Sequence, residues 1–479
     1  MLLRKTKIVA TLGPASASEE MIARMITSGV DVVRLNFSHG SAAEHIERAD
    51  IVRRIATKLN RPIGVLCDLQ GPKIRIGKFE NGKILLSSGD LFVLNADCGL
   101  GDQFQVGLDY KSLPQEVQAG NTLLLDDGRI TMTVDFVKGN QIHCVILAGG
   151  TLSNNKGINL QGGGLAADAL TKKDLEDLKV AVALEADYIA ISFPKNSQDI
   201  LYAKALVKKA GGTASIIAKI ERAEAIDNLE AIIEASDAIM VARGDLGVEV
   251  GDAAVPGLQK RMIRMARSQN KLVITATQMM ESMIVSPIPT RAEVSDVANA
   301  VLDGTDAVML SAETASGQYP LETVQAMHRV CVEAEKEYEG LQRVEHRVGR
   351  LQHTDEAVAA AAIFTSQHFK VKAIAALTQS GNAAQWLSRA DSSVPIYAIS
   401  PDKVARRKLT LHRNVFPFPI EQSGKNRDEI LFEMEQVLLY NGAVKTGDMV
   451  LLTFGEPIGS PGGTNSLKII KIGENRPIF

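Results

Sequence analysis

The sequence predicts an α/β protein built on a TIM (β/α)8 barrel, with an inserted all-β domain and a C-terminal α/β domain. Three observations lead to this fold class. Apolar strand patterns alternate eight times with amphipathic helix patterns. The strands are apolar on both faces, as buried parallel strands are. A glycine-rich stretch without a good helix pattern breaks the alternation once, after the third strand. Eight units close a barrel, and a long open parallel sheet is the alternative.

The first three units occupy residues 1–70. Their strands are KIVATLGP, VDVVRLNFSHG and IGVLCDLQGP. The first helix pattern, SASEEMIARMITSG, is expected to begin after Ser18 and to end at Gly29, because serine favours N-caps and glycine favours helix ends. The second is SAAEHIERADIVRRIATKLN.

Residues 71–168 are expected to form the insert, a β-barrel domain without a good helix. Its runs alternate in polarity: KIRIGKF, GKILLS, NTLLLDDG and RITMTVDFV. The barrel resumes over 169–345 with the helix TKKDLEDLKVAVALEA. Five strands follow, namely DYIAISFP, SIIAKIE, DAIMVARGDLG, KLVITATQ and DAVMLSAET, and the last helix is PLETVQAMHRVCVEAEKEY.

A polar run at about 346–350 predicts a linker, and residues 346–479 are expected to form a separate α/β domain. Its helices are DEAVAAAAIFTSQHF, NAAQWLSRA, KVARRKLTLHR and NRDEILFEMEQVLLYNG, and its strands are KAIAALTQS, PIYAIS, DMVLLTFGEP and TNSLKIIKI. The basic helix KVARRKLTLHR is expected to be a solvated or subunit-facing surface.

Composition excludes several classes of function. The 479 residues carry a net charge of −3 and only 4% aromatic residues, so nothing favours binding to nucleic acid or to a membrane. The four cysteines form no CxxC pair, which argues against zinc and disulfides and fits a reducing compartment. With neither a signal peptide nor a long apolar stretch, a soluble cytoplasmic protein is expected.

Chemistry in such barrels lies where the strands end. Nearly every strand here ends in polar residues, in chain order Thr11; Arg34, Asn36, Ser38 and His39; Asp68; Ser192; Lys219 and Glu221; Arg243, Gly244 and Asp245; Thr275, Thr277 and Gln278; Ser311 and Glu313. So many polar strand ends at one barrel mouth predict a functional site.

The residue types at this mouth indicate phosphoryl transfer. Lys219 and Glu221 lie on one face of their strand, so they form either an ion pair or part of a ligand site. Glu221 and Asp245 are hard oxygen donors suited to magnesium, and Lys219 and Arg34 can hold a phosphoryl group. The run ARGDLG is expected to open a helix with free amides. The alternative is that the carboxylates only pair with Lys219 or Arg243.

Seven segments carry a family resemblance: RLNFSHG, DLQGPKIR, AKIERAEAI, IMVARGDLG, ITATQMMESM, PTRAEVSDVANAVLDGTDAVMLSAET and the insert. Together they resemble pyruvate kinase, in particular its bacterial form, over almost the whole chain. The resemblance implies phosphoryl transfer from phosphoenolpyruvate to ADP, giving pyruvate and ATP, the last step of glycolysis. It also implies Mg²⁺ or Mn²⁺, an insert that closes as a lid over the nucleotide, a homotetramer, and an allosteric sugar-phosphate or nucleotide effector.

The same resemblance assigns the catalytic residues. It implies that Lys219 stabilises the moving phosphoryl group and the enolate, and that Glu221 and Asp245 bind the divalent metal. Arg34 matches the arginine that holds the phosphoryl group. Thr277 matches the threonine near the substrate carboxylate and the protonated carbon.

Further residues follow from the resemblance. The amides of Gly244 and Asp245 would bind the substrate carboxylate. Ser311 is a catalytic candidate acting through a water relay, or else a helix cap or turn residue. The nucleotide side is assigned to Asn36, His39, Arg75 and Lys156.

Asn36, Ser38, Asp68 and the carbonyl of Leu69 match the ligands of a monovalent cation. Lys73 stands where potassium-dependent members of the family carry Glu. Its ammonium can replace the charge of K⁺, so activity without potassium is expected. The alternative is a lysine that points to solvent.

The C-terminal domain resembles the effector domain of the family. Thr378, Ser380 and Gly381 keep a phosphate-binding turn, but Asn382, Ala383 and Ala384 follow where many members have Arg and a hydroxyl residue. A facing Gly-rich loop at 459–466 includes Gly463 and Thr464. Effector binding is expected to be altered, or the loop is vestigial.

Two other functions compete with a kinase. One is a Mg-dependent barrel lyase or mutase that acts on a phosphoenolpyruvate-like acid without nucleotide; such an enzyme needs neither a lid nor His39 and Arg75. The other is a non-catalytic binder. Loss of Lys219, Glu221 or Asp245 would indicate a binder, and all three are present.

Overall fold

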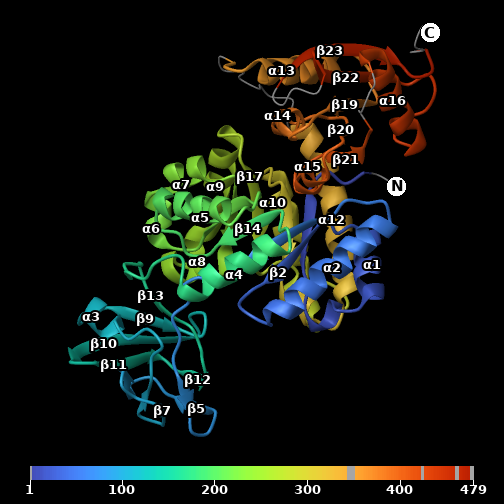
Figure 1. The fold of residues 1–479 in the computed structure, drawn as a ribbon. Coiled ribbons are helices and arrows are strands. Elements are labelled where there is room, and N and C mark those ends of the chain that lie inside the picture. Colours follow the sequence, from blue (N-terminus) through green and yellow to red (C-terminus); the bar gives the residue numbers. More distant parts are fainter. Residues whose placement is uncertain (1–2, 342–350, 422–425, 459–462, 475–479) are drawn as a thin grey trace.

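The computed structural model describes residues 3–341, 351–421, 426–458 and 463–474. Figure 1 shows a central barrel with the insert on one side and the C-terminal α/β part on the other. The linker expected at 346–350 lies outside the described residues. Among the described helices, none combines the length and apolar character needed to cross a bilayer.

The predicted barrel is confirmed. Eight parallel strands close on themselves in the order β1-β18-β17-β16-β15-β14-β3-β2. Their bounds are β1 Lys7–Thr11, β2 Val32–Asn36, β3 Gly64–Asp68, β14 Tyr188–Ile191, β15 Ser215–Ile220, β16 Ala238–Ala242, β17 Leu272–Ala276 and β18 Ala307–Leu310. Almost every strand residue is buried, which explains the continuous apolar runs in the sequence.

Helices and short turns surround the barrel. The helices are α1 Glu19–Ser28, α2 Ala42–Lys58, α4 Lys172–Ala183, α5 Ser197–Lys209, α6 Ala223–Asp227, α7 Leu229–Ala235, α8 Arg243–Val250, α9 Val255–Ser268, α10 Arg291–Leu302, α11 Ala312–Ala315 and α12 Pro320–Leu341. The expected limits of α1 are confirmed, since Ser18 Oγ accepts a hydrogen bond from Met21 N and Gly29 follows the last turn with φ 127°.

The insert is β-rich but does not form the expected closed barrel. Its strands are β4 Lys78–Phe79, β5 Lys83–Leu86, β6 Leu91–Asn95, β7 Leu100–Gly101, β8 Gln105–Val106, β9 Thr122–Leu125, β10 Ile130–Lys138, β11 Gln141–Ala148, β12 Gly150–Ser153 and β13 Ile158–Leu160, with one short helix, α3 Leu113–Glu116. They pair as an open sheet of six strands and two sheets of two. Among the described strands, the six-stranded sheet ends at β13 and β8, which do not pair with each other, so it stays open.

The C-terminal part is a five-stranded sheet with helices. It contains α13 Thr354–His368, β19 Ala373–Leu377, α14 Asn382–Arg389, β20 Ile396–Ser400, α15 Lys403–Leu409, β21 Val415–Pro419, α16 Arg427–Tyr440, β22 Met449–Gly455 and β23 Thr464–Lys471. The sheet order is β21-β20-β19-β22-β23. Strand β21 was not predicted because its sequence, VFPFP, contains two prolines; it is an edge strand, where proline is tolerated.

The base of the barrel carries a repeated aspartate. In chain order, every second barrel strand is preceded by one, namely Asp31, Asp187, Asp237 and Asp306. Their carboxylates accept backbone N–H groups of the preceding strand, from Ile8, Val65, Ile216 and Val273, at 2.7–2.9 Å. Each aspartate therefore ties the starts of two adjacent strands together.

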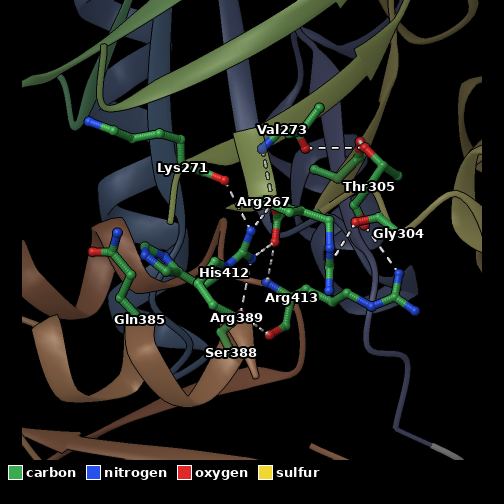
Figure 2. Close-up of polar contacts among 12 residues, drawn as sticks. Arg267, Lys271, Val273, Gly304, Thr305, Gln385, Ser388, Arg389, His412 and Arg413 are labelled. Carbon is green, nitrogen blue, oxygen red and sulfur yellow. Dashed lines mark hydrogen bonds and ion pairs between the residues drawn. The ribbon is translucent and has the colours of Figure 1, made fainter. Parts of the chain in front are cut away.

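Arginines of the C-terminal domain pair with two of these aspartates. Arg389 of α14 pairs with Asp306, and Arg407 of α15 donates to Asp187 at 2.7 Å. The basic helix expected to be a solvated or subunit-facing surface thus faces the barrel through Arg407. Figure 2 shows Arg389, His412 and Arg413 gathered beside Val273 and Thr305 of the barrel. This domain covers the base, so the opposite end remains for the mouth.

Candidate active site

Four charged side chains alternate in sign across the barrel mouth. Arg34 Nε lies 2.7 Å from Asp68 Oδ2, and Lys219 Nζ lies 3.2 Å from Asp68 Oδ1. Lys219 Nζ also lies 2.9 Å from Glu221 Oε1. These residues come from β2, β3 and β15 and from the residue after β15, so three strand ends build one row of charges. We call Arg34, Asp68, Lys219 and Glu221 the charged row.

Burial and pairing set the charges of this row. Burial opposes a charge on Lys219, but the carboxylates of Asp68 and Glu221 outweigh it and raise the pKa of the ammonium. Burial likewise opposes the Asp68 carboxylate, yet Lys219 and Arg34 lower its pKa. Lys219 and Asp68 therefore stay charged at neutral pH.

Glu221 and Asp245 form a pair of carboxylates suited to a divalent metal. Burial raises the pKa of Glu221; the Lys219 charge opposes this, and the Asp245 charge raises it further. Two adjacent carboxylates of this kind are the oxygen donors that Mg²⁺ binds together with substrate oxygens. The described residues contain no group of three or more His, Cys, Asp or Glu arranged for a metal, so these two carboxylates fit a metal only with substrate oxygens or water beside them.

The segment after β17 has an unusual backbone. Thr277 and Gln278 have φ values of 66° and 55°, which residues other than glycine rarely adopt. Thr277 Oγ1 accepts a hydrogen bond from Gly244 N at 2.8 Å. Arg243 donates to Thr277 O at 2.7 Å and forms a bidentate ion pair with Asp296. Sequence patterns gave no sign of Asp296, because its partner lies 53 residues away.

Thr277 and Gly244 are thus brought together as expected, but the Gly244 amide expected for the substrate carboxylate donates to Thr277 here. Ser311 N donates to Glu313 Oε2 at 2.6 Å, and burial raises the pKa of Glu313. Ser311 occupies the N-cap position of α11, but its Oγ is buried and makes no capping bond and no other hydrogen bond among the described residues. The position therefore fits the cap alternative, whereas the side chain does not act as a cap.

The nucleotide-side residues lie on two parts of the molecule. His39 is exposed after β2, close to the barrel mouth. Arg75 and Lys156 lie together in the insert, where Arg75 forms a β-bridge with Gly157. Arg75 Nη1 donates to Asn155 O at 3.0 Å, and Lys156 Nζ pairs with Asp126 at 2.6 Å.

The residues expected around a monovalent cation are near one another in the fold. Asn36 Oδ1 accepts from Ser38 N at 3.1 Å, and Asn36 pairs with Asp68 across β2 and β3. The Leu69 carbonyl accepts from Ser192 Oγ at 2.7 Å. All four candidates lie at the ends of these two strands.

Lys73 does not simply point to solvent. Its Nζ lies 3.1 Å from Asp245 Oδ1 and 4.0 Å from Asp127 Oδ1 of the insert. The side chain is 27% exposed. The ammonium therefore faces a carboxylate of the barrel mouth, and its partner is Asp245 rather than Asp68.

The effector candidates lie in the C-terminal domain. In the turn after β19, Gly381 N donates to Thr378 Oγ1 at 2.9 Å, and Gly381 has φ 95°. Ser380 is exposed in this turn. Gly463 and Thr464 mark the start of β23, while residues 459–462 of the expected facing loop lie outside the described residues.

Comparisons with known proteins cover both the barrel and the C-terminal part. The family model "Pyruvate kinase, barrel domain" matches residues 3–324, and "Pyruvate kinase, alpha/beta domain" matches residues 356–470. The chain is 49% identical over 479 residues to pyruvate kinase II of Salmonella typhimurium, covering 98% of this chain and 99% of that one. It is 50% identical over 477 residues to a pyruvate kinase of Buchnera aphidicola, with 98% and 99% covered. With a pyruvate kinase of Mycobacterium tuberculosis the identity is 40% over 477 residues, with 99% and 100% covered.

Proposed function

The chain belongs to the pyruvate kinase family and acts as a pyruvate kinase, and we propose that the charged row is where it holds the phosphoryl group of phosphoenolpyruvate. The alternating charges of Arg34, Asp68, Lys219 and Glu221 carry this proposal. Phosphoryl transfer needs positioned cations more than covalent chemistry. A buried arginine and a largely buried lysine that flank one carboxylate meet that need.

Lys219 and Arg34 act on the transferred group. Each lies within a barrel strand, and each is paired with Asp68, so their donors keep a fixed separation. The incoming phosphoryl oxygens compete with Asp68 for these donors. Lys219 then stabilises the negative charge as this charge moves from the phosphoryl group to the enolate oxygen. This is electrostatic stabilisation by preorganised donors.

Glu221 and Asp245 would hold the divalent metal that the family implies, Mg²⁺ or Mn²⁺. When bound, this metal neutralises charge on the phosphoryl and enolate oxygens. Glu221 is held by its partners, because Lys219 Nζ and Phe193 N donate to its two oxygens. Asp245 lies in the first turn of α8, beside the amide of Gly244.

Thr277 and Ser311 serve the substrate carboxylate and the carbon that is protonated. The Gly244 amide turns from Thr277 Oγ1 to the substrate carboxylate as phosphoenolpyruvate binds, and the Asp245 amide lies next to it. The Ser311 hydroxyl, without a hydrogen-bond partner among the described residues, orders the water that delivers the proton.

The nucleotide binds between barrel and insert. Asn36 and His39 contact it from the barrel, and Arg75 and Lys156 contact it from the insert as the insert closes and excludes water. In this division residues 1–70 and 169–345 form the catalytic barrel, 71–168 the lid, and 346–479 the effector and oligomerisation domain.

Potassium is not required. Asn36, Ser38, Asp68 and the Leu69 carbonyl form the monovalent-cation site of the family, and Lys73 supplies a fixed positive charge at the same mouth. Its 3.1 Å contact with Asp245 supports a charge directed into the mouth.

The remaining proposals rest on family membership. The protein assembles as a cytoplasmic homotetramer. Its activity responds to a sugar-phosphate or nucleotide effector bound by Thr378, Ser380, Gly381, Gly463 and Thr464. The hydrogen bond from Gly381 N to Thr378 Oγ1 supports a preformed turn after β19.

The first experiment measures pyruvate formation from phosphoenolpyruvate, ADP and Mg²⁺ in buffer free of sodium and potassium, and again with KCl. Fast turnover in both supports the proposed roles and the replacement of K⁺ by Lys73. Turnover that needs KCl overturns the Lys73 role. Turnover without ADP would contradict a kinase.

A further inference from the structure

Ser192, the residue after β14, joins the catalytic lysine to a backbone carbonyl. Its side chain is buried, and Lys219 Nζ donates to its Oγ at 2.7 Å. The same Oγ donates its proton to Leu69 O at 2.7 Å. A serine hydroxyl has one proton, so this bond turns the oxygen lone pairs toward the ammonium. Ser192 therefore presents an acceptor to Lys219 in a fixed direction.

The ammonium makes three polar contacts in this site. Two are ion pairs with the carboxylates of Asp68 and Glu221, and the third is the hydrogen bond that it donates to Ser192. Lysine ends in a compact charge on a flexible stem, so charge alone leaves its direction loose. Ser192 is the one neutral acceptor among the three, and its direction is set by a hydrogen bond.

Ser192 itself has little room to move. A Cβ added to Gly71 would lie 2.7 Å from Ser192 Cβ, so the backbone at the start of the insert packs directly against this serine. The next residue, Phe193, has φ 56° and donates its N–H to Glu221 at 3.0 Å. The turn after β14 thus positions Lys219 through a side chain and Glu221 through an amide.

We propose that Ser192 is a positioning residue, which fixes the direction of the Lys219 ammonium by accepting a hydrogen bond from it. This inference rests on the proposed role of Lys219 in phosphoryl transfer. In this proposal Ser192 acts through Lys219 and has no separate role toward the substrate or the nucleotide. The effect of Ser192 therefore falls on the chemical step and not on nucleotide binding.

Thr11 repeats the arrangement at the other cation of the charged row. Its Oγ1 accepts from Arg34 Nη1 at 3.0 Å and donates to Leu310 O at 2.8 Å. Since Arg34 is a phosphoryl-binding residue, loss of the Thr11 hydroxyl is expected to raise the KM for phosphoenolpyruvate. Steady-state assays therefore distinguish the two hydroxyls, because loss of the Ser192 hydroxyl should lower kcat and loss of the Thr11 hydroxyl should raise KM.

The test compares Ser192→Ala with Ser236→Ala, a matched control at the far end of the barrel. Ser236 is also buried, and its Oγ donates to Ile232 O at 2.6 Å. Ser192→Ala is expected to lower kcat by about tenfold to a hundredfold, the range for a slightly misplaced catalytic group. The KM for ADP stays at its wild-type value, and the unfolding midpoint stays near that of Ser236→Ala.

Ser192→Cys is the second variant, because it keeps the shape of the side chain with a somewhat larger atom and replaces the hydroxyl with a poorer acceptor. It too is expected to lower kcat alone. A wild-type kcat in either folded variant, or an equal loss in Ser236→Ala, overturns the positioning role. Full turnover in Lys219→Met would instead overturn the role of Lys219, so the two failures are distinguishable.

Discussion

Lys219 Nζ and Glu221 Oε1 lie 2.9 Å apart at the end of one strand, although the two side chains are only 12% and 1% exposed. Burying such a pair gains little stability, because desolvation offsets most of the attraction between the charges. Asp68, Arg34 and Asp245 add three more charges to the same mouth. An apolar pair would serve folding as well, so this concentration of charge is explained by ligand binding.

Lys219→Met is expected to abolish nearly all turnover while phosphoenolpyruvate still binds. Arg34 and the proposed metal ligands remain, but the ammonium proposed to stabilise the moving phosphoryl group is gone. Loss of one such donor typically costs at least about a hundredfold to a thousandfold in kcat. Steady-state assays give kcat, and titration calorimetry with phosphoenolpyruvate gives binding.

Lys204→Met is the matched control for that variant. Lys204 pairs with Asp237 at 2.7 Å, at the base of the barrel and away from the mouth. Its replacement should leave turnover at the wild-type level. Unchanged turnover in Lys219→Met would remove this lysine from the mechanism.

Lys73→Glu is expected to make activity depend on potassium. The substitution removes the ammonium 3.1 Å from Asp245 and adds a carboxylate to a mouth that already contains several. A monovalent cation then restores the lost charge. The assay is a KCl titration at constant ionic strength, with tetramethylammonium chloride as the balancing salt. A flat response in the variant would show that Lys73 does not replace K⁺.

The sequence was sufficient to predict the barrel and to predict which strand ends lie at its mouth. Apolar runs followed by Lys219, Glu221 or Asp68 identify buried strands that end in polar groups, and parallel strands bring their ends together. Local signals also located α1, because Ser18 and Gly29 act within one helix turn of its ends.

Such local signals could not predict contacts between residues that are distant in the sequence. The positive φ of Thr277 depends on Arg243 and Asp296, and the contact of Ser192 with Gly71 depends on where the insert leaves the barrel. Strand β21 was missed because proline argues against strands, although an edge position permits it. The helix containing Arg407 looked like a solvated surface, since its partner Asp187 lies 220 residues earlier.

His412 is expected to make stability fall as the pH falls. Burial lowers the pKa of His412 to about 4, against about 6.5 in an unfolded chain. The unfolded state therefore binds a proton first, so the contribution is complete above about pH 6.5 and is lost between about 6.5 and 4. The loss is of the order of 3 kcal/mol.

His412→Gln keeps a donor for Lys408 O, which His412 Nδ1 contacts at 3.3 Å, but does not titrate. Urea unfolding of both proteins at pH 8 and pH 5 gives the measurement, with pH 8 as the common reference because His412 is neutral there. The free energy of unfolding should fall less in the variant. Equal falls would contradict this contribution of His412.

Arg389→Leu is expected to destabilise the contact between the C-terminal domain and the barrel. Arg389 Nη1 donates to Asp306 Oδ2 at 2.9 Å, and the Asp306 side chain is 0% exposed. The substitution leaves a buried carboxylate without its main partner, which typically costs about 3–5 kcal/mol. Arg54→Leu is the matched control, since its pair with Glu19 is exposed and is worth at most about 1 kcal/mol.

Asp306→Asn added to Arg389→Leu should recover part of the lost stability, because it removes the stranded charge. The amide oxygen of the new side chain can still accept from Val273 N, which donates to the Asp306 carboxylate at 2.9 Å. Urea unfolding at pH 8 compares the three variants with the wild type. Equal stabilities for Arg389→Leu and Arg54→Leu would mean that the Arg389 pair does not hold the domain on the barrel, and the base aspartates would then stabilise the barrel strands alone.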